Sequence, residues 1–148
     1  MNTLTHIQQQ TIENHAEEAL ELLKNLISTP SYSGEEDQTA ALLESDLKRN
    51  GFPVQRIQNN VIARSKTWND ELPTLLLNSH HDTVRATENW VTDPFEPVLK
   101  GEQLFGLGSN DAGAPLVSLL QTFYLLQEKE QPFNLVFLAS AEEETSGV

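Results

Sequence analysis

Residues 74–82 read TLLLNSHHD, an apolar run that passes directly into a polar cluster. The run is too short for a helix and follows Pro73, so residues 74–78 predict a buried strand. Residues 134–139, NLVFLA, predict a second buried strand, and three consecutive glutamates begin three residues later. Buried strands that end in polar side chains are typical of an α/β sheet with its functional site at the strand ends.

Helical periodicity fills the stretches around these strands. Residues 11–27 predict a helix that Thr29-Pro30 ends. Ser33 and Glu36 have the S-x-x-E spacing of a capping box, which predicts a helix from there to about residue 50. We expect a third helix over residues 114–128. The other expected strands are residues 54–57, 60–63 and 103–105, and residues 82–101 are expected to be irregular. Helices and strands that alternate in this way predict an α/β fold with helices on both faces of the sheet.

Composition and charge exclude several classes of protein. Of 148 residues, 38% are hydrophobic, which is enough for the core of one domain. Acidic residues outnumber Lys and Arg by 22 to 9, so the net charge of −13 disfavours nucleic acid and membrane surfaces as partners. The absence of cysteine excludes disulfides and Cys-ligated zinc. No apolar run could span a bilayer and the N-terminus lacks a signal-peptide pattern, so we expect a cytoplasmic protein.

Three polar clusters lie where such a sheet places function. They are His80-His81-Asp82 after a strand, Asp111 before a helix, and Glu142-Glu143-Glu144 after the last strand. Each has an ordinary structural explanation: a hydrogen-bonded histidine, a helix N-cap, and acidic residues that complement a helix dipole. Together they combine imidazole with carboxylate oxygens, the ligands of zinc and similar ions. One histidine with several carboxylates suits a site for two metal ions.

The motifs that contain these clusters resemble those of a known enzyme family. Residues 75–84 (LLLNSHHDTV), 104–111 (LFGLGSND) and 140–147 (SAEEETSG) are similar, in order and spacing, to motifs of the co-catalytic zinc amidohydrolases. This family includes acetylornithine deacetylase, aminoacylase, succinyl-diaminopimelate desuccinylase and glutamate carboxypeptidases. Residues 29–36 (TPSYSGEE) resemble its N-terminal signature. The resemblance implies a three-layer αβα domain with a mostly parallel central sheet.

The resemblance also implies a role for each residue of the site. His80 would bind one metal ion, Glu144 the other, and Asp111 would bridge both. Asp82 would hold the His80 ring in the required tautomer, and Glu143 would act as general base and then as proton donor.

Two further expectations concern neighbours of these residues. His81 occupies the variable position of its motif, so its side chain is expected to point away from the site. The bond between Asp111 and Ala112 is expected to be cis, as is common in the family.

The implied activity is metal-dependent hydrolysis of the amide bond of an N-acyl amino acid. Zinc is the expected ion, with cobalt or manganese as alternatives. Residues 106–108 (GLG) favour the acetylornithine deacetylase branch, so N-acetylornithine, and with it arginine biosynthesis, is the expected assignment. Related desuccinylases, aminoacylases and dipeptidases remain alternatives, because Arg85 and residues 112–114 depart from the usual family pattern.

The family's site needs more than this sequence contains. A further carboxylate and a second histidine ligand come later in the family, as does a smaller dimerisation domain. We therefore expect residues 1–148 to be the N-terminal part of the catalytic domain of a homodimeric enzyme, and to be inactive alone.

Two rival interpretations belong to other functional classes. A non-catalytic binding protein could have kept the fold. Residues 106–111 could instead begin a dinucleotide fingerprint, but Asp111 stands in place of the third glycine and its charge would oppose a pyrophosphate. The sequence contains neither G-x-S-x-G nor H-E-x-x-H, so serine hydrolases and single-zinc proteases lack support.

Overall fold

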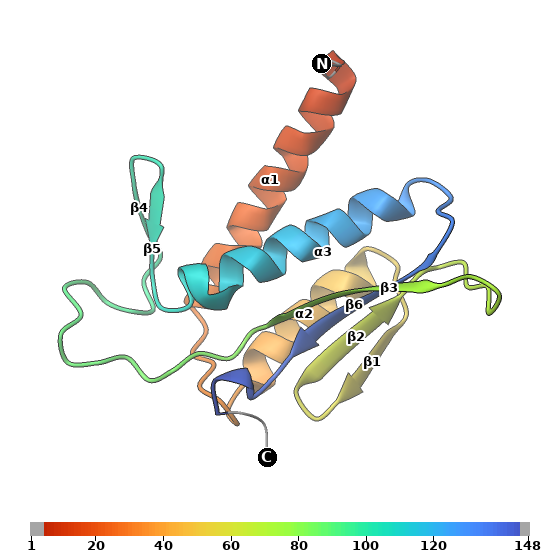
Figure 1. The fold of residues 1–148 in the computed structure, drawn as a ribbon. Helices are drawn as coiled ribbons and strands as arrows, with labels where there is room; N and C mark the ends of the chain where they lie inside the picture. Colours follow the sequence, from red (N-terminus) through yellow and green to blue (C-terminus); the bar gives the residue numbers. More distant parts are fainter. Residues whose placement is uncertain (1–4, 146–148) are drawn as a thin grey trace.

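The computed structural model describes residues 5–145, which are built around a four-stranded sheet (Figure 1). Its strand order is β1-β2-β6-β3, with β1 at Val54–Ile57, β2 at Asn60–Arg64, β3 at Thr74–His80 and β6 at Asn134–Ser140. β3 and β6 are parallel, with His80 opposite Ser140 at the last register position. The two strands therefore end at the same edge of the sheet.

Two helices, α2 (Asp37–Arg49) and α3 (Ala114–Gln127), pack on one face of this sheet (Figure 1). A third helix, α1 (His6–Ile27), packs mainly against α3 on the same side. Leu135 and Phe137 of β6 point into the core that these helices form and are fully buried. Val136, between them, points to the other face and is only half-buried. α2 and α3 also contact each other, since the Tyr124 hydroxyl of α3 donates a hydrogen bond of 2.7 Å to Asp46 of α2.

The expected α/β fold is confirmed, and the described residues show how its layers are distributed. Within residues 5–145 the helices form one layer, so these residues make two of the three expected layers. The sheet is mixed, with β3–β6 as the parallel pair and β1–β2 and β2–β6 antiparallel. The antiparallel pairing of β1 and β2 has a local cause. Only Gln58 and Asn59 separate the two strands, and so short a connection permits only a hairpin.

Two local expectations need correction. α1 begins at His6 rather than at residue 11, because Thr5 and Gln8 form a capping box that the apolar periodicity does not reveal. Residues 82–101 are not irregular throughout: β4 (Val98–Lys100) pairs with β5 (Gln103–Phe105) in a hairpin. Gly101, with φ of 60°, allows the tight turn between them.

None of the helices in residues 5–145 is long and apolar enough to cross a bilayer.

Candidate metal centre

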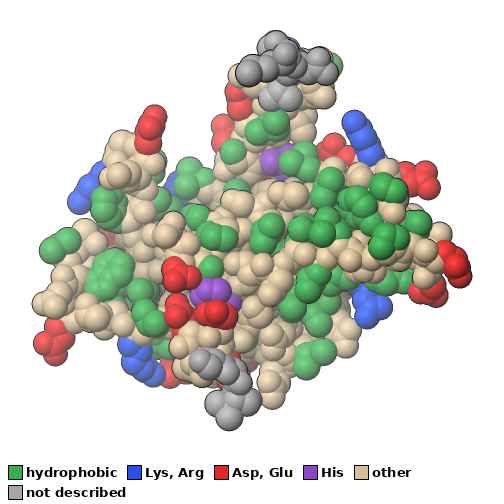
Figure 2. Space-filling model, viewed as in Figure 1, with side chains coloured by type: hydrophobic (Ala, Val, Ile, Leu, Met, Phe, Trp, Pro, Cys, Tyr) green, Lys and Arg blue, Asp and Glu red, His purple; other side chains and the backbone are tan. Residues whose placement is uncertain are grey.

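Three of the predicted site residues converge at the carboxyl edge of the sheet. His80 ends β3, Glu144 follows β6 in a short 3-10 turn (Glu143–Thr145), and Asp111 lies in the turn before α3. One ligand atom from each of these three side chains lies within 4.8 Å of the other two. Among residues 5–145 this is the one group of three potential metal ligands. In Figure 2 acidic side chains surround a histidine on this face of the molecule.

The His80 ring lies among three carboxylates, those of Asp82, Asp111 and Glu143. Its Nε2 atom is 3.1 Å from Oδ1 of Asp111 and 3.8 Å from Oε2 of Glu143. Its Nδ1 atom faces the opposite way, 3.2 Å from the Asp82 carbonyl oxygen and 3.3 Å from the Asp82 carboxylate. A proton held on Nδ1 by Asp82 leaves the Nε2 lone pair free to bind a cation beside Asp111.

Asp82 also fixes the backbone that carries the two glutamates. This carboxylate is fully buried and accepts hydrogen bonds from the Glu143 amide at 3.1 Å and the Glu144 amide at 3.0 Å. The Ser33 hydroxyl donates a third hydrogen bond to it, at 2.7 Å. Asp82 therefore links His80 at the end of β3 to Glu143 and Glu144 in the turn after β6.

The charges of the cluster shift the pKa values of its members. Burial lowers the pKa of His80, but the hydrogen bond to Asp111 and the charge of Asp82 outweigh burial and raise it. Burial raises the pKa of the Glu144 carboxyl, and the nearby charge of Asp111 raises it further. Burial also acts to raise the pKa of Asp82, but the hydrogen bonds from Ser33 and the two backbone amides outweigh it and lower the pKa.

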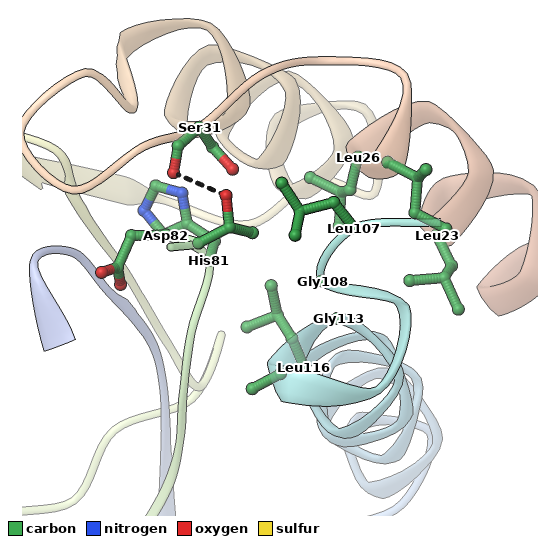
Figure 3. A pocket seen from close by; sticks show the side chains of 12 residues that line it. Leu23, Leu26, Ser31, His81, Asp82, Leu107, Gly108, Gly113 and Leu116 are labelled. Atoms are coloured by element: carbon green, nitrogen blue, oxygen red, sulfur yellow. Dashed lines mark hydrogen bonds between the residues drawn. The ribbon is translucent and has the colours of Figure 1, made fainter. Parts of the chain in front are cut away.

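Close packing behind the cluster determines where Asp111 lies. Figure 3 shows a small cavity with His81 and Asp82 on one side and leucines on the other, where Gly108 and Gly113 approach the end of α1. A Cβ atom on Gly113 would lie 2.6 Å from the Gly108 carbonyl oxygen. The bond between Asp111 and Ala112 in this turn is cis, which confirms the expectation.

The structure places His81 away from the cluster, as expected for the variable position of its motif. Its ring is buried, with Nδ1 at 2.9 Å from the Thr39 hydroxyl and Nε2 at 3.0 Å from the Asn59 carbonyl oxygen.

The sequence prediction was wrong about Ser33 and Glu36. They do not form a capping box: Glu36 is the N-cap of α2 but makes no side-chain cap hydrogen bond. The Ser33 hydroxyl bonds Asp82, and the Glu36 carboxylate bonds the Glu142 amide at 3.1 Å. The S-x-x-E spacing could not reveal this because both partners are distant in the sequence.

The donor set fits a divalent cation. It consists of one imidazole nitrogen and carboxylate oxygens, which suits zinc and also manganese or cobalt. The charged groups that shift the pKa of Glu144 include three carboxylates and no lysine or arginine. A bound cation would therefore relieve the repulsion between Asp111 and Glu144.

Comparison with known proteins finds one similar family and several similar structures. Residues 76–148 match peptidase family M20/M25/M40. The structure is similar to the di-peptidase Dug1p from Saccharomyces cerevisiae (TM-score 0.72, 22% identity, 92% of this chain and 34% of that protein). It is also similar to the M20 metallo-carboxypeptidase Sso-CP2 from Sulfolobus solfataricus (TM-score 0.72, 24% identity, 88% and 32%). A third similar structure is the YXEP protein from Bacillus subtilis, described as a dinuclear metal binding peptidase from the M20 family (TM-score 0.69, 19% identity, 91% and 38%).

At these identities the structural likeness shows a shared fold. The chain spans about a third of the length of these three proteins. The motif residues from Asn78 to Glu144 all fall inside the matched segment. Over residues 76–148, just under half of the chain, the sequence is therefore similar to peptidase family M20/M25/M40.

Proposed function

We propose that the complete protein is a metal-dependent hydrolase that cleaves the amide bond of a small substrate, and that this substrate is N-acetylornithine. The observation that carries the proposal is the convergence of His80, Asp111 and Glu144, with the Glu143 carboxylate 3.8 Å from the same His80 nitrogen. Two divalent ions are proposed, with zinc as the first choice.

Each residue has a proposed task at this site. When bound, the ions supply Lewis-acid polarisation and make water a better nucleophile at neutral pH. His80, Asp111 and Glu144 would hold them, and Asp82 would keep the His80 ring in position through Nδ1. Glu143 has a half-exposed side chain, so it can reach an incoming substrate. Its carboxylate would take the proton of the attacking water and then donate it to the leaving amine.

A dipeptidase activity is the second candidate. It is favoured by the similarity to the Saccharomyces cerevisiae di-peptidase. An N-acyl amino acid and a dipeptide present the same chemistry, since both contain a secondary amide beside a carboxylate. The two candidates therefore differ in what surrounds the amide, not in the reaction.

We further propose that residues 1–148 are the N-terminal part of the catalytic domain. Support comes from the similar proteins, which extend over about three times this length. The remaining metal ligands would come from other parts of that domain.

A substrate panel tests the proposal. The complete protein is stripped with a chelator, reloaded with zinc, and assayed with N-acetylornithine, N-succinyl amino acids and a series of dipeptides. We expect zinc-dependent release of acetate from N-acetylornithine. Zinc-dependent cleavage of dipeptides alone would support the second candidate, and no cleavage of any amide with zinc bound would contradict both.

A further inference from the structure

We infer that Glu36 is a positioning residue for the proposed hydrolase: through the backbone amide of Glu142, it holds the turn that carries Glu143 and Glu144. This inference rests on the proposed function, but its first test does not require turnover.

Glu36 is fully buried, and within residues 5–145 only Asp46 and Asp82 are also buried carboxylates. Its Oε1 atom accepts hydrogen bonds from the Gly34 amide at 2.8 Å and the Glu142 amide at 3.1 Å. Its Oε2 atom accepts one from the side-chain amide of Asn59 at 2.9 Å. A buried carboxylate is costly unless its oxygens are bonded in this way, so the three donors and the carboxylate hold one another in place.

The residue that Glu36 holds has an unusual backbone. Glu142 has φ of 60°, the left-handed region that residues with a side chain seldom adopt. This turn aims the next residues back toward β3, where Asp82 accepts the amides of Glu143 and Glu144. Three successive amides are thus bonded by two buried carboxylates from different elements. Asp82 fixes the last two, and Glu36 fixes the residue at which the chain reverses.

A partly buried polar network supports Glu36 from behind. Asn59, in the β1–β2 turn, bonds Glu36 through its amide nitrogen, while its Oδ1 atom accepts a hydrogen bond of 2.7 Å from Arg56. The Asn59 carbonyl oxygen lies 3.0 Å from Nε2 of His81, whose Nδ1 atom contacts Thr39. Because every member has a partner, Glu36 has little freedom to move, and neither does the Glu142 amide. The variable histidine of the motif thus belongs to this supporting network.

The directions of these hydrogen bonds allow a sharp test. Glu36→Gln keeps the shape but places an NH2 group against the NH2 group of Asn59. The Asn59 amide cannot turn over without losing its contact with Arg56. Adding Asn59→Asp restores a donor and an acceptor at this contact, and the side-chain oxygen of the new glutamine can still accept the two backbone amides. The single variant should therefore be impaired and the double variant should recover.

Asp46→Asn is the matched control. Asp46 of α2 is also a buried carboxylate, and it accepts hydrogen bonds from Tyr124 of α3 and Arg49 of α2. It has no contact with the metal cluster. It reports what the loss of a buried carboxylate does to the domain in general.

Amide hydrogen exchange in the metal-free complete protein is the first measurement. We expect about 10-fold faster exchange at residues 142–144 in Glu36→Gln, wild-type rates there in Asp46→Asn, and recovery in the double variant. Zinc titration and kinetics follow. We expect Glu36→Gln to lose about 10-fold in zinc affinity and in kcat, with KM nearly unchanged, because Glu36 touches no substrate.

Three outcomes would overturn the inference: unchanged exchange at residues 142–144 in Glu36→Gln, equal losses in Asp46→Asn, or a double variant that recovers nothing. If Glu36→Gln does not fold, a folded double variant with wild-type exchange supports the inference, and one with fast exchange overturns it. A wild-type protein that binds no metal and cleaves no amide contradicts the proposed function instead, and leaves the exchange result to decide the role of Glu36.

Discussion

Glu143 and Glu144 are neighbours on one short turn, yet their surroundings differ. The Glu144 carboxyl is half-buried, and one of its oxygens lies within 4.8 Å of a ligand atom of His80 and of Asp111. Burial and the charge of Asp111 raise its pKa. The Glu143 side chain is 59% exposed and reaches the edge of the same group. A carboxylate inside the cluster suits metal binding, whereas one at its rim suits proton transfer to and from a substrate.

This difference predicts that two equivalent substitutions in the complete protein affect different properties. Glu143→Gln should lower kcat by about 100-fold or more with zinc content nearly intact, because glutamine cannot accept the proton. Glu144→Gln should weaken zinc binding by about 10-fold or more, since it removes a charged ligand. Metal analysis beside steady-state kinetics separates the two. Near-normal turnover in the Glu143 variant would remove this residue as the base.

Tyr124 gives a second prediction at the residue scale, far from the metal cluster. Burial raises the pKa of its hydroxyl well above the ordinary value, and the hydrogen bond to Asp46 and the charge of Asp46 raise it further. Tyr124→Phe should cost about 1–3 kcal/mol of unfolding free energy at pH 7, because it leaves the half-paired Asp46 carboxylate buried.

The pH dependence of this effect follows from the direction of the shift. The folded protein holds the Tyr124 proton more tightly than the unfolded chain does. The stabilisation is therefore complete below the unfolded pKa of about 10 and is lost as the pH rises above it. Urea unfolding at pH 7 and at pH 11 should show that the difference in unfolding free energy between the wild type and Tyr124→Phe is smaller at pH 11. If this difference in unfolding free energy is the same at both pH values, the Tyr124 hydroxyl is not held by Asp46.

Among the elements, the turn that carries Asp111 depends on close approach of backbone to backbone. Gly113 has φ of −62°, which alanine could also adopt, so only space excludes a side chain there. A Cβ atom would lie 2.6 Å from both the Gly108 carbonyl oxygen and the Cδ1 atom of Leu23 in α1. The packing of α1 against this turn thus fixes the distance between Asp111 and His80.

Gly113→Ala should therefore lower stability by about 1–3 kcal/mol and weaken zinc binding, because the turn must move. Gly101→Ala is the control: its Cβ would meet nothing within 4 Å, and only its positive φ is unfavourable. It should cost about 1 kcal/mol and leave zinc affinity unchanged. Urea unfolding and zinc calorimetry of both variants check this. Equal zinc affinities in the two variants would mean that the position of this turn does not affect metal binding.

For the molecule as a whole, the described residues supply an incomplete set of ligands. His80, Asp111 and Glu144 gather at one edge, but a catalytic zinc normally has three protein ligands, and two ions would have to share these three residues. The repulsion between their carboxylates also weakens a partial site when no cation is bound.

We therefore predict that the 148-residue chain alone binds zinc weakly and does not cleave N-acetylornithine. Calorimetry of the purified chain with zinc, followed by an acetate-release assay, measures both, and the complete protein serves as the control. Tight stoichiometric zinc binding with steady turnover would mean that no ligand outside these residues is needed.

The sequence by itself determined most of the helices and strands, although not β4 or the start of α1, and it determined the composition of the cluster. Apolar runs at residues 74–78 and 134–139 predicted β3 and β6. The polar residues after these strands and Asp111 before a helix predicted His80, Asp111 and Glu144 as a group. Such features are local, because a short apolar run and the residues that follow it can be recognised without knowing what lies beside them. The cis bond at Asp111 was also expected, but from resemblance to a family rather than from local physics.

Only the tertiary structure decided which partners the polar side chains choose. Ser33 and Glu36 have the spacing of a capping box, yet they bond Asp82 and Glu142, which lie 49 and 106 residues away. The parallel register that brings His80 beside the turn of Glu143 and Glu144 likewise joins segments about 60 residues apart. A carboxylate that becomes buried must find donors wherever the fold places them, and those donors can be distant in the sequence, so no local pattern could reveal them.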